Sequence, residues 1–219
     1  MNNSAKVHQI TRLAILVAII FLLAFTPLGY LVIGPIAATT IQMPVIVGAA
    51  VMGPVSGAIL MGPAGGAILG FFFGLSAIIK VLTMPGADAF ATLALTHSPL
   101  AYLAVCMGAR VCMGLLTGLL ADGLKKIPVL DGKGSIVRYG VTGFVGSALN
   151  TVFYLGLLWA LCAEVISSFY GVDLSGVGAL VMGTAYAAGI PEAIVSCVVV
   201  GAICKAVEKS PVMFKRAAV

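Results

Sequence analysis

Residues 37–74 read AATTIQMPVIVGAAVMGPVSGAILMGPAGGAILGFFFG, a stretch without a single charged residue that decides the fold class of the chain. Glycine and alanine recur in it at short intervals, and Gly53-Pro54 and Gly62-Pro63 interrupt it. Small residues let helices approach closely in a bilayer, where apolar burial no longer drives association, and proline ends or bends a helix. The stretch therefore predicts two membrane helices, joined by a tight cytoplasmic turn and packed at the centre of a helical bundle.

The composition of the whole chain indicates the same environment. Of the 219 residues, 61% are hydrophobic and only 9% are charged, whereas a soluble domain has about 25% charged residues. A membrane helix needs about 20 residues, so the length suits six spans with short loops. We expect an all-α integral membrane protein with one domain over residues 1–219 and spans near 10–28, 36–52, 64–82, 100–124, 136–164 and 179–207.

The basic residues predict the orientation of these spans. If both termini are cytoplasmic, ten of the twelve Lys and Arg residues fall on the inner side, while Lys80 falls near the outside and Arg110 within a span. This asymmetry follows the positive-inside rule. We therefore interpret the net charge of +5 as a topology signal and expect no nucleic-acid partner. The first run, 10–28, could also be a cleaved signal peptide, but no clear cleavage site follows it.

A nine-residue tandem repeat lies within the opening stretch. Residues 52–60 read MGPVSGAIL and residues 61–69 read MGPAGGAIL, with two differences between the copies. Nine residues extend an α-helix by about 13.5 Å. The insertion must lengthen a loop, extend the third span or form a short re-entrant piece, and the sequence leaves these alternatives open.

Four short segments carry a resemblance to a known family. They are IGPIAATTIQMPVIVGAAVMGP at 33–54, GAILGFFFGLSAIIK at 66–80, GSALNTVFYLG at 146–156 and GIPEAIV at 189–195. Over residues 12–205 the chain resembles the S components of energy-coupling-factor (ECF) vitamin transporters, and it looks most like the pantothenate-type branch. The tandem repeat departs from the family pattern, because it gives two Gly-Pro turns where the pattern has one.

This resemblance implies a function and a set of partners. An S component is a six-helix protein of the bacterial plasma membrane that binds a vitamin at its outer face. It docks on an ECF module, which consists of a transmembrane T component and two cytoplasmic ATPases, and topples in the membrane to release the vitamin inside. The first helix commonly carries an Ala-x-x-x-Ala pair that contacts the T component, and the matching residues here are Ala14 and Ala18.

Arg110 is the first candidate for a substrate-binding residue. It lies in the apolar run LAVCMGARVCMG, and placing an arginine at the centre of a membrane helix costs roughly 2.5–3.5 kcal/mol. Its side chain should therefore face a cavity, water or a partner, and its planar fork suits a carboxylate. An internal ion pair with Glu192 and simple snorkelling to the interface are the alternatives.

Glu192 and Asn150 are the next polar residues that we expect inside the bundle. Glu192 follows Gly-Ile-Pro, so its carboxylate either stabilises the first turn of a helix through the helix dipole or accepts a hydrogen bond from the substrate. Asn150 should lie about 21 Å along a helix that enters from the cytoplasm, and its amide can both donate and accept. A hydrogen bond between helices is the alternative for Asn150.

Three further residues complete the candidate site. Thr40 and Gln42 lie in the outer half of the second span, where Gln42 contacts either the substrate or a neighbouring helix. His97 lies in a loop that contains Ser and Pro, and it is either a substrate contact or a solvated residue. Tyr102 and Tyr154 fall near the outer interface, where an aromatic belt is the simpler interpretation.

Several classes of function are excluded by what the sequence lacks. It has no Walker-type loop with lysine, no Ser/His/Asp set, no carboxylate cluster and no metal-type cysteine spacing, so we predict no enzyme, no metal and no cofactor. The rival class is a stand-alone secondary transporter or channel, but the spans hold few polar residues for an ion site or pore.

The expected substrate is a water-soluble vitamin, and pantothenate is the leading candidate. Its one carboxylate, two hydroxyls and amide match one arginine with a few neutral polar groups. Riboflavin and folate are the alternatives. Both would need a wider pocket with more aromatic stacking, and only 8% of the chain is aromatic.

Overall fold

The computed structural model describes residues 3–33, 36–51, 62–84, 89–130 and 135–208. This part of the chain forms eight α-helices and one β-hairpin, with short 3-10 turns at Pro27–Gly29 and Pro128–Leu130 and a π-helical turn at Ala185–Gly189. The elements are α1 Asn3–Ala24, β1 Tyr30–Ile33, β2 Ile36–Thr39, α2 Gln42–Val51, α3 Pro63–Thr83, α4 Ala89–His97, α5 Pro99–Leu124, α6 Ser135–Tyr170, α7 Leu174–Thr184 and α8 Ile190–Glu208.

Within the described residues, four helices are long and apolar enough to cross a membrane. Three of them are α3, α5 and α6, and the fourth is the continuous run Leu174–Glu208, in which the π-helical turn joins α7 to α8. The apolar part of α1, Gln9–Ala24, is shorter. The chain is therefore a helical, multi-pass membrane protein, while the count of six spans and the cytoplasmic placement of both termini remain predictions.

The helices α3 and α5 agree closely with the expected runs 64–82 and 100–124. α6 is longer than the expected run 136–164 and bends at Cys162, whose φ of −128° departs from helical geometry. The first copy of the tandem repeat lies outside the described residues. The second copy begins α3, because Gly62 caps this helix with a φ of 83° that favours glycine and Pro63 occupies its first position, where no amide proton is needed.

The second expected span differs from the structure at its beginning. Residues 36–39 form strand β2 instead of helix, and they pair antiparallel with β1 in the register Tyr30↔Thr39 and Ile33↔Ile36. Helix α2 begins only at Gln42, and Pro44 then lies in its first turn, where proline is tolerated. The apolar composition of 36–41 fits a buried strand as well as a membrane helix, and pairing with 30–33 decides between them.

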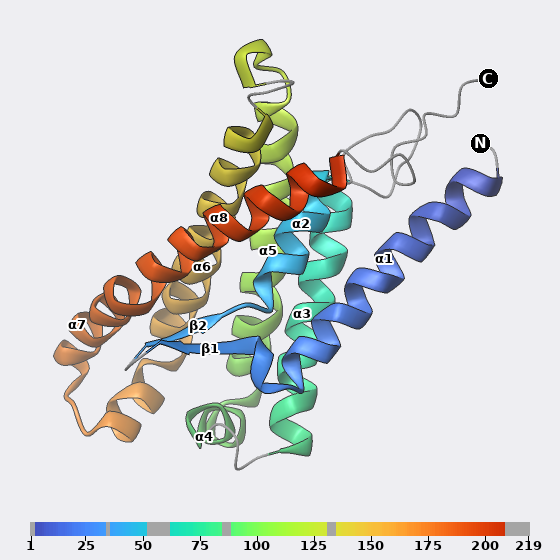
Figure 1. Cartoon of the computed structure of the whole chain (residues 1–219). Helices are drawn as coiled ribbons and strands as arrows, with labels where there is room; N and C mark the ends of the chain where they lie inside the picture. Colours follow the sequence, from blue (N-terminus) through green and yellow to red (C-terminus); the bar gives the residue numbers. More distant parts are fainter. Residues whose placement is uncertain (1–2, 34–35, 52–61, 85–88, 131–134, 209–219) are drawn as a thin grey trace.

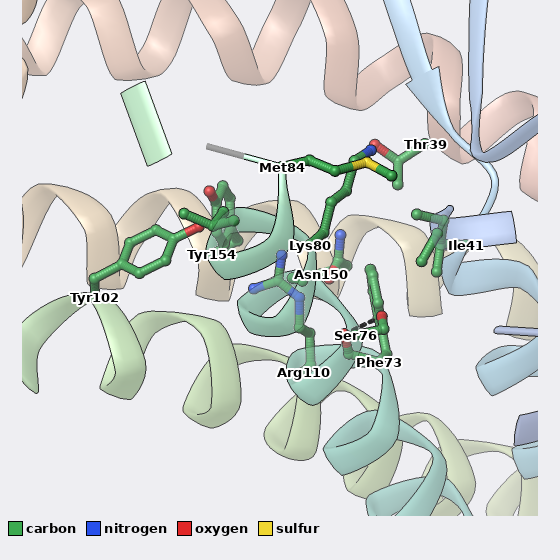
Figure 2. A pocket seen from close by; sticks show the side chains of 13 residues that line it. Thr39, Ile41, Phe73, Ser76, Lys80, Met84, Tyr102, Arg110, Asn150 and Tyr154 are labelled. Atoms are coloured by element: carbon green, nitrogen blue, oxygen red, sulfur yellow. Dashed lines mark hydrogen bonds between the residues drawn. The ribbon is translucent and has the colours of Figure 1, made fainter. Parts of the chain in front are cut away.

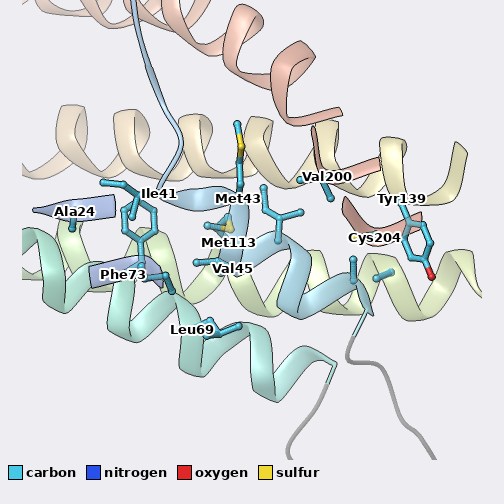
Figure 3. Close-up of a cluster of buried hydrophobic side chains, with 14 residues drawn as sticks. Ala24, Ile41, Met43, Val45, Leu69, Phe73, Met113, Tyr139, Val200 and Cys204 are labelled. Atoms are coloured by element: carbon cyan, nitrogen blue, oxygen red, sulfur yellow. The ribbon is translucent and has the colours of Figure 1, made fainter. Parts of the chain in front are cut away.

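The helices α3 and α5 run side by side through the middle of the bundle (Figure 1) and share its most extensive contact. Glycines make this contact close: a Cβ atom added to Gly66 would lie 2.1 Å from the Gly114 carbonyl oxygen, and one added to Gly70 would lie 2.1 Å from the Arg110 carbonyl oxygen. Two hydrophobic clusters flank the pair. Figure 3 shows the larger one, where α2 inserts Val45 and other side chains between α3 and its neighbours.

Candidate functional site

A cavity of about 320 Å³ opens where α3, α5 and α6 meet the end of the hairpin. Its volume lies within the usual range for small-molecule sites. Figure 2 shows the side chains that surround it. The lining residues are Ala24, Thr39, Ile41, Phe73, Ser76, Ala77, Lys80, Val81, Met84, Tyr102, Arg110, Asn150 and Tyr154.

Arg110 reaches into this cavity from the middle of α5 (Figure 2) and is about nine-tenths buried. Its guanidinium lies between two aromatic rings, 4.8 Å from the ring centroid of Phe73 and 4.7 Å from that of Tyr154. Such contacts stabilise a desolvated cation by up to about 2 kcal/mol each. Nη1 donates to the Cys106 carbonyl oxygen at 3.2 Å, and the buried Nε has no hydrogen-bond partner among the described residues.

This arrangement leaves one edge of the guanidinium suited to an anion. The Cys106 carbonyl occupies Nη1, while the donors on Nε and Nη2 lie on the same edge of the planar fork. A carboxylate can accept from both atoms of such an edge in a bidentate pair. A buried donor without a partner costs about 1–3 kcal/mol, which a bound anion would remove.

Asn150 extends the polar part of the cavity on α6. Its Oδ1 atom is buried and has no hydrogen-bond partner among the described residues. A ligand hydroxyl or amide N–H could donate to it. Ser76, by contrast, already donates its hydroxyl proton to the Phe73 carbonyl oxygen at 2.7 Å within its own helix, so it offers the ligand an acceptor. The cavity is thus lined by two basic side chains, Arg110 and Lys80, by the Asn150 amide and by apolar walls.

Glu192 does not pair with Arg110 in the structure. Its Oε1 accepts the backbone N–H of Thr39 at 2.7 Å, and its Oε2 lies 3.4 Å from Nε2 of Gln42. Gln42 also donates to the Ser147 hydroxyl at 2.9 Å. Glu192 and Gln42 are both buried, and neither lines the cavity. The alternative of an internal Arg110–Glu192 ion pair is therefore not formed.

The other predicted residues lie outside the cavity lining. Thr40 is buried next to the cavity and donates its hydroxyl proton to the Leu28 carbonyl oxygen at 2.6 Å. His97 ends α4 and is exposed, with its Nδ1 3.4 Å from the Ser98 hydroxyl. Ala14 and Ala18 are both exposed on α1, as a docking face would require.

Sequence reasoning missed the aromatic and basic residues that line the cavity. Tyr102 and Tyr154 were expected in an interfacial belt, and Phe73 and Lys80 were not singled out. Phe73 and Tyr154 place their rings next to the Arg110 guanidinium, while Lys80 extends from the last turn of α3 toward Thr39 (Figure 2). The signal that could have found the rings is Arg110 itself, because a buried guanidinium needs aromatic or polar neighbours.

Fold and cavity together define a helical, multi-pass membrane protein with a small cavity within its bundle. In the described residues no group of three or more His, Cys, Asp or Glu side chains could hold a metal ion. The family model of the ECF transporter substrate-specific component matches residues 8–204, so the chain belongs to this family of transporter subunits and is not an enzyme. Membership implies a small-molecule substrate and an ECF module as partner. The comparison with curated proteins gives no match.

Proposed function

We propose that this S component captures a small vitamin that carries one carboxylate, and that pantothenate is its substrate. The observation that carries the proposal is Arg110, a buried cation that lies over two aromatic rings and whose Nε has no partner in the described residues. A carboxylate would bind to this edge in a bidentate pair. The apolar side chains of Phe73 and Ile41 would contact the aliphatic part of the vitamin.

Two properties of the cavity favour pantothenate over the larger vitamins. The free Oδ1 of Asn150 supports a ligand with a hydroxyl or amide donor a few atoms away from its carboxylate. The volume of about 320 Å³ lies near the lower end of the range for small-molecule sites, which suits pantothenate better than riboflavin or folate.

Calorimetry on the purified protein tests the proposal with two ligands, pantothenate and the neutral alcohol that replaces its carboxylate. A hydrogen bond to a charged group contributes about 1.5–3 kcal/mol, so wild type should prefer the acid by roughly tenfold to a hundredfold. Arg110→Met should abolish this preference. Arg110→Lys should restore part of it, because lysine keeps the charge and loses the fork.

Lys126→Met is the matched control, because it removes one positive charge from an exposed position at the end of α5. It should bind both ligands like wild type. If wild type binds the acid and the alcohol equally well, Arg110 does not hold a carboxylate and the choice of pantothenate fails. Binding of riboflavin or folate in place of pantothenate would redirect the proposal to that vitamin.

A further inference from the structure

Glu192 is tied to a wall of the cavity that it does not itself line. Thr39, the last residue of β2, and Ile41, the residue before α2, contribute to that wall. The Thr39 backbone N–H points away from β1 and donates to Glu192 Oε1, at 2.7 Å, across the interval between the hairpin and α8. A carboxylate that accepts a backbone N–H forms one of the stronger hydrogen bonds of a protein.

Two other hydrogen bonds of this wall segment run to the turn that follows α1. Thr40 donates its backbone N–H to the Gly29 carbonyl oxygen at 3.0 Å and its hydroxyl proton to the Leu28 carbonyl oxygen at 2.6 Å. These two bonds connect the segment to the 3-10 turn that follows α1. The bond from Thr39 to Glu192 connects it to α8. The wall is therefore held by the 3-10 turn after α1 and by α8.

The second oxygen of Glu192 engages the next element along the chain. Its Oε2 lies 3.4 Å from Nε2 of Gln42, the first residue of α2, and the same Nε2 donates to Ser147 on α6. One carboxylate thus contacts both ends of the segment 39–42. Glu192 lies in the first turn of α8, which begins at Ile190 directly after the π-helical turn Ala185–Gly189. Such turns are frequent at functional sites.

We infer that Glu192 is a positioning residue, which fixes the Thr39–Ile41 wall of the cavity without touching the substrate. This role rests on the proposed function of the cavity as the vitamin site. Without the carboxylate, the wall spends part of its time displaced, and the apparent affinity falls in proportion to the fraction of molecules with the wall in place. The loss of affinity is the same for every ligand that contacts the wall, whatever charge that ligand carries.

Hydrogen exchange and calorimetry on the full-length protein in detergent test this inference. In wild type without ligand, the Thr39 amide should exchange slowly. Glu192→Ala should accelerate it by roughly tenfold or more, the equivalent of one lost hydrogen bond to a charged acceptor. The same variant should weaken the binding of pantothenate and of its neutral alcohol by equal factors. Loss of a group that contacts the carboxylate would instead weaken the binding of the acid more than that of the alcohol.

Two further variants separate positioning from a general effect on folding. Glu192→Gln keeps an oxygen for the Thr39 N–H, and a flip of the Gln42 amide would turn Oε1 of Gln42, which has no partner among the described residues, toward the new amide as an acceptor. It should restore slow exchange and most of the affinity. Ser196→Ala is the matched control one helical turn further along α8, because the buried Ser196 hydroxyl has no partner in that part of the chain. It should behave like wild type.

The possible failures are distinguishable. Rapid exchange of the Thr39 amide in wild type overturns the inference without any variant, so the test holds even if Glu192→Ala does not fold. A Glu192→Ala variant that weakens only the acid shows that Glu192 acts on the ligand and not on the wall. A wild type that binds neither ligand refutes the proposed substrate, while the exchange of Thr39 still decides whether Glu192 holds the hairpin.

Discussion

Arg110 is the buried charged side chain of the cavity, whereas Lys80, which also lines it, is only half-buried. Arg110 would be costly in an apolar helix, and the structure offsets this cost by placing two ring centroids 4.8 and 4.7 Å from its guanidinium carbon and a carbonyl oxygen next to one nitrogen. These partners are weaker acceptors than a carboxylate. They stabilise the cation in the empty protein and leave a stronger interaction available to the ligand, which is a favourable arrangement for a binding site.

Asn150 provides a prediction at the residue scale. Asn150→Leu removes the free Oδ1 and keeps the side-chain volume similar, so it should weaken pantothenate by about twofold to tenfold, the range of one neutral hydrogen bond. The preference for acid over alcohol should persist, because Arg110 is unchanged. Calorimetry with both ligands measures these two quantities. Unchanged affinity for pantothenate would show that Asn150 is a structural residue of α6.

Arg110 and Glu192 show which features of the site can be predicted from the sequence and which cannot. An arginine in an apolar run carries a large insertion cost, so its position in a cavity can be predicted from the chain alone. The partner of Glu192 cannot, because it is the backbone N–H of Thr39. Almost every residue has a backbone N–H, so the residue types do not indicate which one binds a carboxylate. The Thr39 N–H is available only because residues 36–39 form a strand of a two-stranded hairpin.

At the scale of elements, the fold depends on how closely α3 and α5 approach. Gly66 and Gly114 face each other across this contact: a Cβ atom on Gly114 would lie 2.0 Å from the Gly66 carbonyl oxygen, and one on Gly66 would lie 2.1 Å from the Gly114 carbonyl oxygen. No backbone atom can yield at these distances without a shift of the whole helix. Because Arg110 and Phe73 lie on the same two helices, such a shift would also change the cavity.

Gly114→Ala should therefore destabilise the protein by about 1–3 kcal/mol, the usual range for overpacking, and should weaken ligand binding as well. Gly156→Ala is the matched control on α6, because nothing lies within 4 Å of a Cβ atom added there. This control should be neutral or slightly stabilising, since alanine favours helix over glycine. Thermal unfolding in detergent compares the two variants. Equal melting temperatures would contradict the close helix contact.

The sequence predicts some of these elements better than others. Long apolar helices such as α3 and α5 are predictable because length, composition and flanking prolines agree. The hairpin is not, because its strands of four residues have the apolar character of the membrane helices next to them. The start of α8 is indicated by Gly189 and Pro191, but the π-helical turn before it is hidden, since the apolar run from Leu174 to Glu208 is continuous.

At the scale of the whole molecule, the basic residues gather at one end. In Figure 1 the beginning of α1, the junction of α5 and α6 and the end of α8 lie at this end, whereas the α6–α7 junction and α4 lie at the other. Lys125, Lys126, Arg138 and Lys205 belong to the first group, and Lys80 ends α3 at the opposite end. This distribution supports the predicted orientation with the basic end in the cytoplasm.

Thiol labelling in a variant without the five native cysteines tests this orientation. Val129→Cys lies at the basic end, where Val129 is 85% exposed, and should react with an impermeant reagent only after the membrane is opened. Ser168→Cys lies at the other end, near the exposed end of α6, and should react in intact cells. The reverse labelling pattern would contradict the predicted orientation and would mean that the hairpin end of the cavity faces the cytoplasm.

Docking on the ECF module gives the last prediction, which involves the outer surface of α1. Ala14 and Ala18 are four residues apart and therefore lie on one helix face, and both are exposed. Replacing both with Trp should block the approach of a helix of the T component and reduce uptake by about tenfold or more. Ligand binding by the isolated protein should persist, because neither residue lines the cavity.

The matched control replaces Ala104 and Ala160, exposed on α5 and α6, with Trp, which adds the same bulk to other lipid-facing surfaces. Uptake into vesicles that contain the whole transporter, measured beside calorimetry on the subunit, separates loss of docking from loss of binding. If the α1 variant transports at the wild-type rate while the control fails, the T component docks on α5 and α6 instead.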